Sequence, residues 1–236
     1  MMTNVANFKH PEFLVSVDWL LENLEDPNLR IYDCTAHLIP HPTETYTIGS
    51  GKGDYEKAHI PGADFLDLQQ ELSNNTSKLR FTFPSAEHFS KAIGAHGLSN
   101  DNQAILYSTT SPQWATRIWW MLRAFGFDNA KVLDGGLIRW VQKGYPTSTI
   151  PSTYPEQSFT AKPRPGLIIQ KSEVLEGIHE SNTCIINALS QEQHIGVGGR
   201  TYGRPGRIKD SENVPTTELI DPETNEFYPA AVIAER

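Results

Sequence analysis

The sequence contains few cysteines, no long apolar run and no excess of positive charge. Its 236 residues include only Cys34 and Cys184, which is too few for a disulfide framework and fits a reducing compartment. No stretch approaches the roughly 20 apolar residues that a membrane-spanning helix needs. The formal net charge of −8 lacks the basic footprint of a nucleic-acid-binding protein. Membrane proteins, disulfide-rich secreted proteins and nucleic-acid binders are therefore disfavoured.

The first residues also lack the features of a targeting segment. Residues 1–7 have neither the basic region nor the apolar region of a secretory signal, and they are not rich in arginine as transit peptides are. The apolar fraction of 38% is enough for a real core, and the length allows one large domain or two of ordinary size. We expect a soluble, cytoplasmic protein.

Strand and helix signals alternate over the first part of the chain. Ser16 and Ser85 are placed to cap helices, and Pro112 is placed at the start of a long helix that ends before Gly126. The predicted strands cover residues 29–32, 104–107 and 131–134, and a polar loop is expected from about 43 to 53. This alternation predicts an α/β fold with a mostly parallel sheet and helices on both faces.

A motif occurs twice, and it divides the chain. Residues 54–63 read DYEKAHIPGA, and residues 202–211 read YGRPGRIKDS, a degraded copy that again follows a helix-like stretch and a strand. A segment rich in proline, serine and threonine lies between the two copies. We therefore predict a complete domain over residues 10–147, a linker over 148–166, and the first half of a second, similar domain over 167–236.

Four sequence features occur together in a known order. They are Asp33, the motif around 55–63, RIWWMLR at 117–123, and LDGGLIRW at 133–140. In this combination the chain resembles the tandem-domain rhodaneses, the thiosulfate and 3-mercaptopyruvate sulfurtransferases. The resemblance implies two rhodanese-like α/β domains, no metal or cofactor, and small anionic sulfur substrates. It also implies a silent first domain and a second domain whose cysteine cycles through a persulfide.

The family's cysteine follows an apolar strand and precedes a helix, where backbone N–H groups and the helix dipole favour a thiolate. In the first domain the matching position is Ser108, whose hydroxyl cannot carry a persulfide. In the second domain the matching strand, loop and helix would follow Arg236. No catalytic residue is therefore nominated. We expect the chain to be inactive as it stands, with residues 167–236 poorly packed or completed by a partner chain. The alternative is a non-catalytic module that binds a partner or an anion.

Other residues have both a functional and a structural interpretation. Arg200, Arg204 and Arg207 surround a glycine-rich loop and could bind an anionic substrate, or they could form a solvated basic stretch. Cys34 and Cys184 lie at apolar strands and are interpreted as buried packing residues.

Two histidine patterns and an aromatic series receive structural interpretations. His37 and His41 follow Cys34 at spacings that resemble a metal site, but no fourth ligand is evident. In the motif of the family that the chain resembles, the histidine at the position of His59 braces the turn after a strand, so His59 is expected to be structural rather than a general acid or base. The tryptophans at helical spacing are expected to serve packing rather than binding: Trp114, Trp119 and Trp120. A phosphatase of related fold would need a Cys-x5-Arg loop, which is missing after residue 107.

Overall fold

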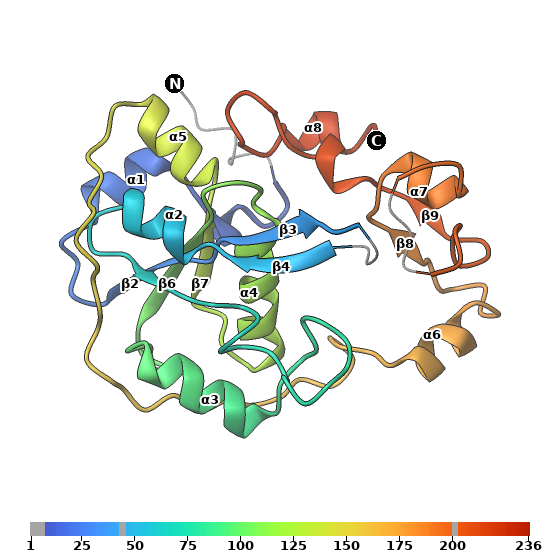
Figure 1. Ribbon diagram of the computed structural model, residues 1–236, viewed down its shortest axis with the longest axis horizontal. Helices are drawn as coiled ribbons and strands as arrows, with labels where there is room; N and C mark the ends of the chain where they lie inside the picture. The colour runs from blue at the N-terminus through green and yellow to red at the C-terminus, as the bar shows by residue number, and fades with distance from the viewer. Residues whose placement is uncertain (1–7, 43–45, 200–202) are drawn as a thin grey trace.

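The computed structural model describes residues 8–42, 46–199 and 203–236. Its body is a parallel five-stranded sheet in the order β1-β7-β6-β2-β5 (Figure 1). The strands are β1 (Leu14–Val15), β2 (Leu29–Asp33), β5 (Asp64–Phe65), β6 (Gln103–Tyr107) and β7 (Ala130–Leu133). The predicted α/β class is confirmed, and the three predicted strands form the centre of the sheet.

Helices cover both faces of this sheet, and the central strands alternate their side chains between them. Leu106 faces the layer made by α3 (Ala86–Ala95) and α4 (Gln113–Ala124). Ile105 faces the opposite layer, which includes α1 (Val17–Glu22) and α5 (Gly136–Gln142). A further helix, α2 (Lys52–Lys57), overlaps the start of the sequence motif at residues 54–63. The sheet is thus buried on both sides, as its apolar strands require.

The helices begin where their capping residues predict. The Ser16 hydroxyl accepts a hydrogen bond from the Trp19 N–H at 3.2 Å, and the Ser85 hydroxyl accepts one from the His88 N–H at 3.2 Å. Both serines have extended backbone and so satisfy an N–H group that would otherwise have no partner in the first turn. These two caps confirm the predicted starts of α1 and α3.

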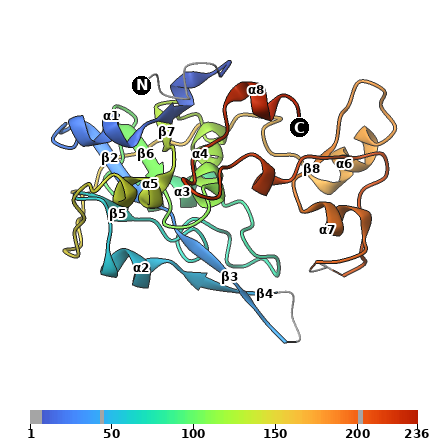
Figure 2. The same ribbon diagram turned by 90° about the horizontal axis from the view of Figure 1, so that it is seen from above.

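A β-hairpin replaces most of the polar loop that was predicted around residue 48. It consists of β3 (Ala36–Pro40) and β4 (Tyr46–Ser50), which pair antiparallel and project from the body (Figure 2). The loop prediction is wrong over residues 46–53, because β4 is followed directly by α2. Residues 43–45 lie outside the described part of the chain. The side chains of β4 are half-buried or exposed, so this strand shows no buried-exposed alternation in its sequence.

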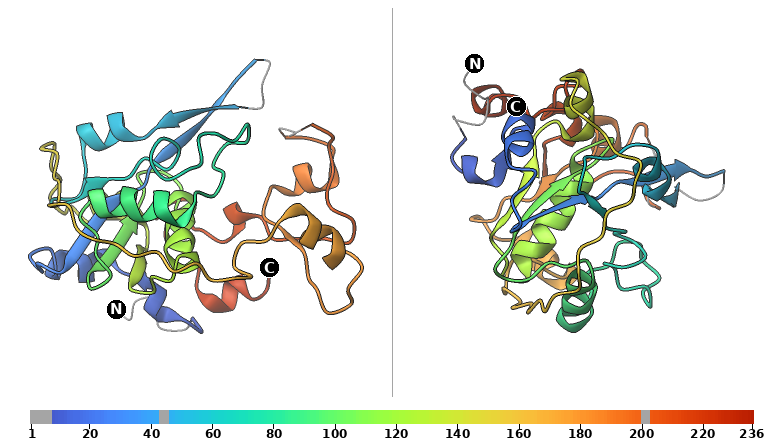
Figure 3. Two further views of the ribbon diagram at one scale, coloured as in Figure 1. Left: turned by 90° about the horizontal axis from the view of Figure 1, so that it is seen from below. Right: turned by 90° about the vertical axis from the view of Figure 1, so that its left-hand side faces the viewer.

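The segment from 145 to 165, here called the strap, runs back along the body without helix or strand of its own (Figure 3). His59 and Ser148 exchange two backbone hydrogen bonds, and the Lys162 N–H donates to Phe125 at 2.7 Å. Phe159 is buried, with its ring centroid 6.1 Å from Phe89 and 5.7 Å from that of Phe127. The strap is therefore part of the first core's packing.

Residues after the strap form a smaller, more open body beside the first (Figures 1 and 3). Its elements are α6 (Lys171–Gly177), β8 (Ile186–Asn187), α7 (Gln191–Ile195), β9 (Glu212–Asn213), the 3-10 helix η3 (Thr216–Glu218) and α8 (Ala230–Ile233). Strands β8 and β9 pair in parallel. Leu175, Ile186 and Val197 are exposed there. Across the described ranges, no helix has the length and apolarity to cross a membrane.

Candidate functional site

Three polar residues follow neighbouring strands at the carboxyl edge of the sheet. Asp33 ends β2, Ser108 follows β6 and Asp134 follows β7. All three are nearly or fully buried. The carboxyl ends of parallel strands meet at one edge, which is where open α/β sheets bind their ligands. This edge contains the position that the sequence predicts for a nucleophile.

Ser108 is locked in place by the start of the helix that follows the next strand. Its hydroxyl donates to the Ser111 carbonyl at 2.6 Å, and its own carbonyl accepts from the Leu137 N–H at 3.3 Å. A Cβ on Gly136 would lie 2.4 Å from that carbonyl oxygen, so glycine is required for this close approach, at a φ of 53°. The Ser108 side chain is 1% exposed. Its hydroxyl therefore neither faces solvent nor lies free for reaction.

A hydrogen-bonded network connects Asp33 to the same loop. The Thr35 N–H donates to the Asp33 carboxylate at 2.9 Å, and the Thr109 hydroxyl donates to its other oxygen at 3.3 Å. The Thr109 N–H in turn donates to the Thr35 hydroxyl at 2.8 Å. Burial raises the pKa of Asp33, and the hydrogen bonds from Thr35 partly offset this effect. The network thus holds the ends of β2 and β6 together and fixes the loop.

A segment near the C-terminus closes the other side of this edge. Residues 221–228, here called the clasp, place the Phe227 N–H 2.8 Å from an Asp134 carboxylate oxygen. The Asn225 side chain donates to the Thr110 carbonyl at 2.8 Å, and Arg139 forms an ion pair with Glu226 at 3.2 Å. Burial raises the pKa of Asp134 to about 7, although the Phe227 hydrogen bond favours the ionised form.

Between the clasp and the Ser108 loop lies a cavity of about 430 Å³. Its polar lining consists mainly of hydroxyl and amide groups, and its apolar lining comes from prolines and isoleucines: Thr109, Thr110, Ser111, Pro112, Gln113, Ile138, Thr216, Thr217, Ile220, Pro222 and Asn225. None of these side chains is an ionisable acid, base or thiol. The cavity can hold a small polar molecule, but its walls supply no nucleophile.

The comparisons with known proteins identify the fold around this edge. Residues 16–143 match the family model described as a rhodanese-like domain. The chain belongs to the rhodanese family. Residues 16–143 are called the rhodanese unit below.

Relatives align with nearly the whole chain. Thiosulfate/3-mercaptopyruvate sulfurtransferase 2 of Arabidopsis thaliana is 32% identical over 92% of this chain and 68% of its own length. The 3-mercaptopyruvate sulfurtransferase of Escherichia coli (strain K12) is 32% identical over 88% and 73%. The crystal structure of SseA from Escherichia coli, a 3-mercaptopyruvate sulfotransferase, superposes with a TM-score of 0.78 at 30% identity, covering 94% of this chain and 81% of that one. The similarity therefore extends beyond the rhodanese unit into residues 167–236.

The arginines considered for anion binding lie away from any described partner. Arg200 is outside the described residues. Arg204 and Arg207 are exposed, on the irregular segment between α7 and β9. Neither forms an ion pair with a residue of the described ranges. The structure does not bring them together with Ser108 through any recorded contact, so their role in substrate binding stays a prediction.

The two cysteines have different environments. Cys34 is fully buried beside the Tyr107 carbonyl, and burial raises the pKa of its thiol well above the usual value, as does the nearby Asp33. Its interpretation as a packing residue is confirmed. Cys184 is exposed, so the same interpretation is wrong for it. Its strand-like sequence lies in the open C-terminal body, where apolar side chains find little cover.

The histidine patterns resolve into structural contacts. The two ring nitrogens of His59 lie 2.6 Å from the Tyr55 carbonyl and 3.0 Å from the Ile150 carbonyl. This geometry confirms the bracing role expected for His59. His37 lies 2.7 Å from Asp54, whereas the Cys34 sulfur contacts backbone in the core, so these two residues do not share a metal site.

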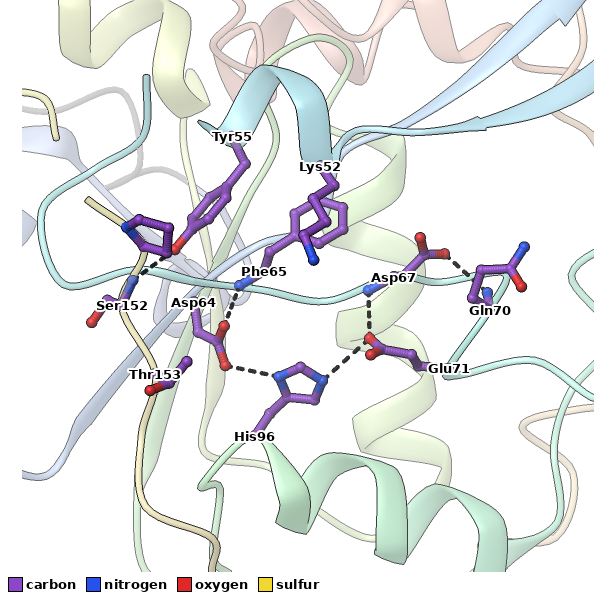
Figure 4. Close-up of a pocket in the computed structure, with 11 residues that line it drawn as sticks. Lys52, Tyr55, Asp64, Phe65, Asp67, Gln70, Glu71, His96, Ser152 and Thr153 are labelled. Atoms are coloured by element: carbon purple, nitrogen blue, oxygen red, sulfur yellow. Dashed lines mark hydrogen bonds and ion pairs between the residues drawn. The ribbon is translucent and has the colours of Figure 1, made fainter. Parts of the chain in front are cut away.

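A second, charged cavity of about 350 Å³ lies beside β5, and its lining includes residues of α2 and His96 at the end of α3 (Figure 4). His96 points between Asp64 and Glu71, at 2.8 Å and 3.2 Å. Burial lowers the pKa of His96, but the hydrogen bonds that its ring donates to Asp64 and Glu71 outweigh this and raise the pKa to about 9. The imidazolium is thereby neutralised internally and serves to hold the loop before α3. Asp64, Glu71 and His96 are far apart in the sequence, so no local motif predicts this cluster.

Proposed function

We propose that this chain takes part in sulfur transfer of the kind named for its relatives, with thiosulfate or 3-mercaptopyruvate as donor and cyanide or a thiol as acceptor. In this proposal the rhodanese unit is a non-catalytic module. The observation that carries the proposal is Ser108, at the place where a rhodanese nucleophile stands. A hydroxyl does not ionise at neutral pH, and here it is 1% exposed and donates to the Ser111 carbonyl. It cannot hold sulfane sulfur as a persulfide.

Neither cysteine supplies a reactive thiolate by its environment. A nucleophilic cysteine needs a lowered pKa and access to solvent. Cys34 has neither, because burial raises its pKa and seals it in the core. Cys184 has access, but it precedes β8 rather than lying between a strand and a helix N-terminus. We infer that the persulfide-bearing cysteine comes from a further polypeptide segment or a partner chain.

The C-terminal body is the proposed docking partner for that segment. It exposes large apolar side chains: Ile169, Leu175, Ile186, Leu189, Ile195, Val197, Ile208 and Val232. Covering apolar surface of this kind yields roughly 25 cal/mol for each Å². Arg204 and Arg207, with Arg200, are the proposed ligands for the anionic sulfur donor, because guanidinium groups pair well with oxyanions. Residues 167–236 then form part of a second rhodanese-like domain.

An assay of thiocyanate formation from thiosulfate and cyanide tests this proposal. We expect the purified chain to give no thiocyanate above the protein-free rate, and we expect Cys184→Ser and Ser108→Ala to behave identically. Turnover that disappears in Cys184→Ser would assign the sulfur-carrying role to Cys184 and overturn the proposal. Turnover that survives in Cys184→Ser but disappears in Cys34→Ser would overturn the structural assignment of Cys34.

The second candidate function is a non-catalytic module that binds an anion or a partner without sulfur transfer. The hydroxyl-lined cavity beside the Ser108 loop favours it, because that cavity is shaped but carries no reactive group. Thiosulfate titrated into wild-type protein and into the double variant Arg204→Ala/Arg207→Ala distinguishes the two. Binding lost in the variant supports the sulfur-donor site, and binding unchanged in the variant favours the module.

A further inference from the structure

Arg117 is a largely buried cation that has no carboxylate partner among the described residues. It lies on α4, and one terminal nitrogen donates to the Phe81 carbonyl at 3.0 Å. Its Nε is buried and has no hydrogen-bond acceptor among the described residues. Burial lowers the pKa of the guanidinium, and no anion opposes that effect. The guanidinium lies over the Phe83 ring, 5.8 Å from its centroid, but a charge taken from water without an anion is costly and calls for an explanation.

Neighbouring arginines of the same unit are paired in the ordinary way. Arg123, two turns further along α4, forms an ion pair with Asp128 at 3.4 Å. Arg139 on α5 pairs with Glu226 at 3.2 Å. Both are partly exposed. These two partly exposed arginines have carboxylate partners, whereas Arg117, whose Nε is buried, has none among the described residues.

The unpaired guanidinium lines a cavity of about 350 Å³. Its lining residues come from the β3–β4 hairpin, the segment leading into α3, and the first turns of α4, elements that can be found in Figure 1. Its other walls are mostly apolar or aromatic: Leu38, Tyr46, Leu68, Phe81, Gln113 and Trp114. Small-molecule sites commonly combine such walls with one or two polar groups that fix orientation. We call this cavity the Arg117 pocket.

The wall formed by Phe81 is held in an unusual backbone conformation. Its φ is 55°, in the left-handed region that a bulky residue rarely adopts. Two contacts keep it there: its N–H donates to the Gln69 side chain at 3.0 Å, and its carbonyl accepts from Arg117. Its ring centroid lies 5.4 Å from that of Trp114. Strained residues persist where surrounding contacts fix them, and they concentrate at ligand sites. The pocket wall and the cation are therefore preorganised together.

We propose that the Arg117 pocket binds a small organic carboxylate with an apolar body. The carboxylate accepts hydrogen bonds from the guanidinium and supplies the missing negative charge. The apolar body lies against Leu68, Phe81 and Trp114. Besides Arg117, the polar side chains of the lining are Gln113, the first residue of α4, and Tyr46 of β4. This site goes beyond the proposed function, because it depends on the charge balance at Arg117 and on neither the sulfur-carrying cysteine nor the clasp.

Calorimetric titration of phenylacetate, with phenylacetamide as its neutral isostere, tests the site on the full chain. We expect phenylacetate to bind the wild-type protein at least about tenfold more tightly than phenylacetamide, because only the anion pairs with the buried guanidinium. The variant Arg117→Met keeps an apolar side chain of similar length and is expected to lose this preference. Arg123→Met, which removes a paired cation from the same helix outside the pocket, is the matched control and is expected to bind like the wild type.

Thermal unfolding provides a second measurement. Without ligand, Arg117→Met is expected to unfold at about the same temperature as the wild type, because removal of a buried charge without an anion offsets the loss of the hydrogen bond to the Phe81 carbonyl. Phenylacetate is expected to raise the unfolding temperature of the wild type but not of Arg117→Met. Equal affinities of the wild type for phenylacetate and phenylacetamide, or no binding of either at millimolar concentration, would overturn the proposal without recourse to any variant. Undiminished phenylacetate binding by Arg117→Met would do the same.

Discussion

Replacing Asp134 with asparagine is expected to stabilise the protein above neutral pH and to leave its stability unchanged in acid. Asparagine is neutral and nearly isosteric, and its oxygen can still accept the hydrogen bond that the Phe227 N–H donates at 2.8 Å. The aspartate is 4% exposed, so water solvates its ionised form poorly. The substitution therefore imitates the protonated acid at every pH.

The magnitude follows from the pKa of the Asp134 carboxyl, which burial raises from 3.8 to about 7. Because the folded protein holds this proton more tightly than the unfolded chain, stability is full below about pH 4 and falls as the pH rises to about 7. A pKa difference of about 3 corresponds to about 4 kcal/mol, which is an upper limit because the surroundings relax around the ionised group. At about pH 8 we expect Asp134→Asn to gain about 1–4 kcal/mol in free energy of unfolding.

Urea unfolding of both proteins between about pH 4 and pH 9 measures this gain. The difference between the two curves reports Asp134, since Asp33, Glu226 and Arg139 are present in both proteins. Asp134→Ala is the control: it removes the acceptor of the Phe227 hydrogen bond and should be less stable than Asp134→Asn at every pH. A difference that does not change with pH, or an asparagine variant that is less stable than the wild type at pH 8, would refute the reasoning.

Three further outcomes follow from the structure. His96→Gln should destabilise the protein by about 1–3 kcal/mol at pH 6, where the contribution of the imidazolium is full. Because the folded protein keeps this proton up to about pH 9, the loss should shrink as the pH rises from 6.5 through about 9; an equal loss at pH 6 and pH 10 would contradict the ion-pair role. A thiol reagent added to native protein should modify Cys184 rapidly and Cys34 only on unfolding, as mass spectrometry of the labelled peptides can show; fast labelling of both would mean that the core around Cys34 opens readily. Tyr154→Phe should cost about 1–2 kcal/mol in urea unfolding, because the hydroxyl donates a hydrogen bond to the Gly62 carbonyl and accepts a part-buried one from the Ile31 N–H. A change below about 0.5 kcal/mol would show that these contacts of the strap contribute little to stability.

The elements of the first body could be predicted because their signals are local. Ser16 and Ser85 cap the turns that directly follow them, and the strand over 104–107 is a continuous apolar run, as a strand buried on both faces must be. The hairpin β3–β4 gave no such signal. Its two strands have little buried surface and pair only with each other. Their sequences therefore show neither the two-residue alternation of a half-buried strand nor the 3.6-residue period of a helix.

The candidate site was predictable at one position and not at its surroundings. Ser108 could be located because a strand, a loop and a helix follow one another in sequence. The clasp that covers this edge comes from much later in the chain. Its Asn225 contacts Thr110, more than 100 residues earlier, and its Phe227 contacts Asp134. The solitary charge of Arg117 could not be foreseen either, because RIWWMLR reads as an amphipathic helix, and only the folded structure shows which cation lacks an anion.

The strap also determines where the first folding unit ends. Strand β5 is two residues long and leaves the Ile31 N–H of β2 without a neighbouring strand, and the Tyr154 hydroxyl accepts that hydrogen bond at 3.0 Å. A side chain from outside the sheet thus replaces a third residue pair between β2 and β5. A fragment ending at residue 143, where the family match ends, would leave this donor unpaired and would uncover the core around Phe159. During synthesis the packing around the sheet can therefore be completed only after the strap has left the ribosome, about 20 residues beyond the last helix of the rhodanese unit.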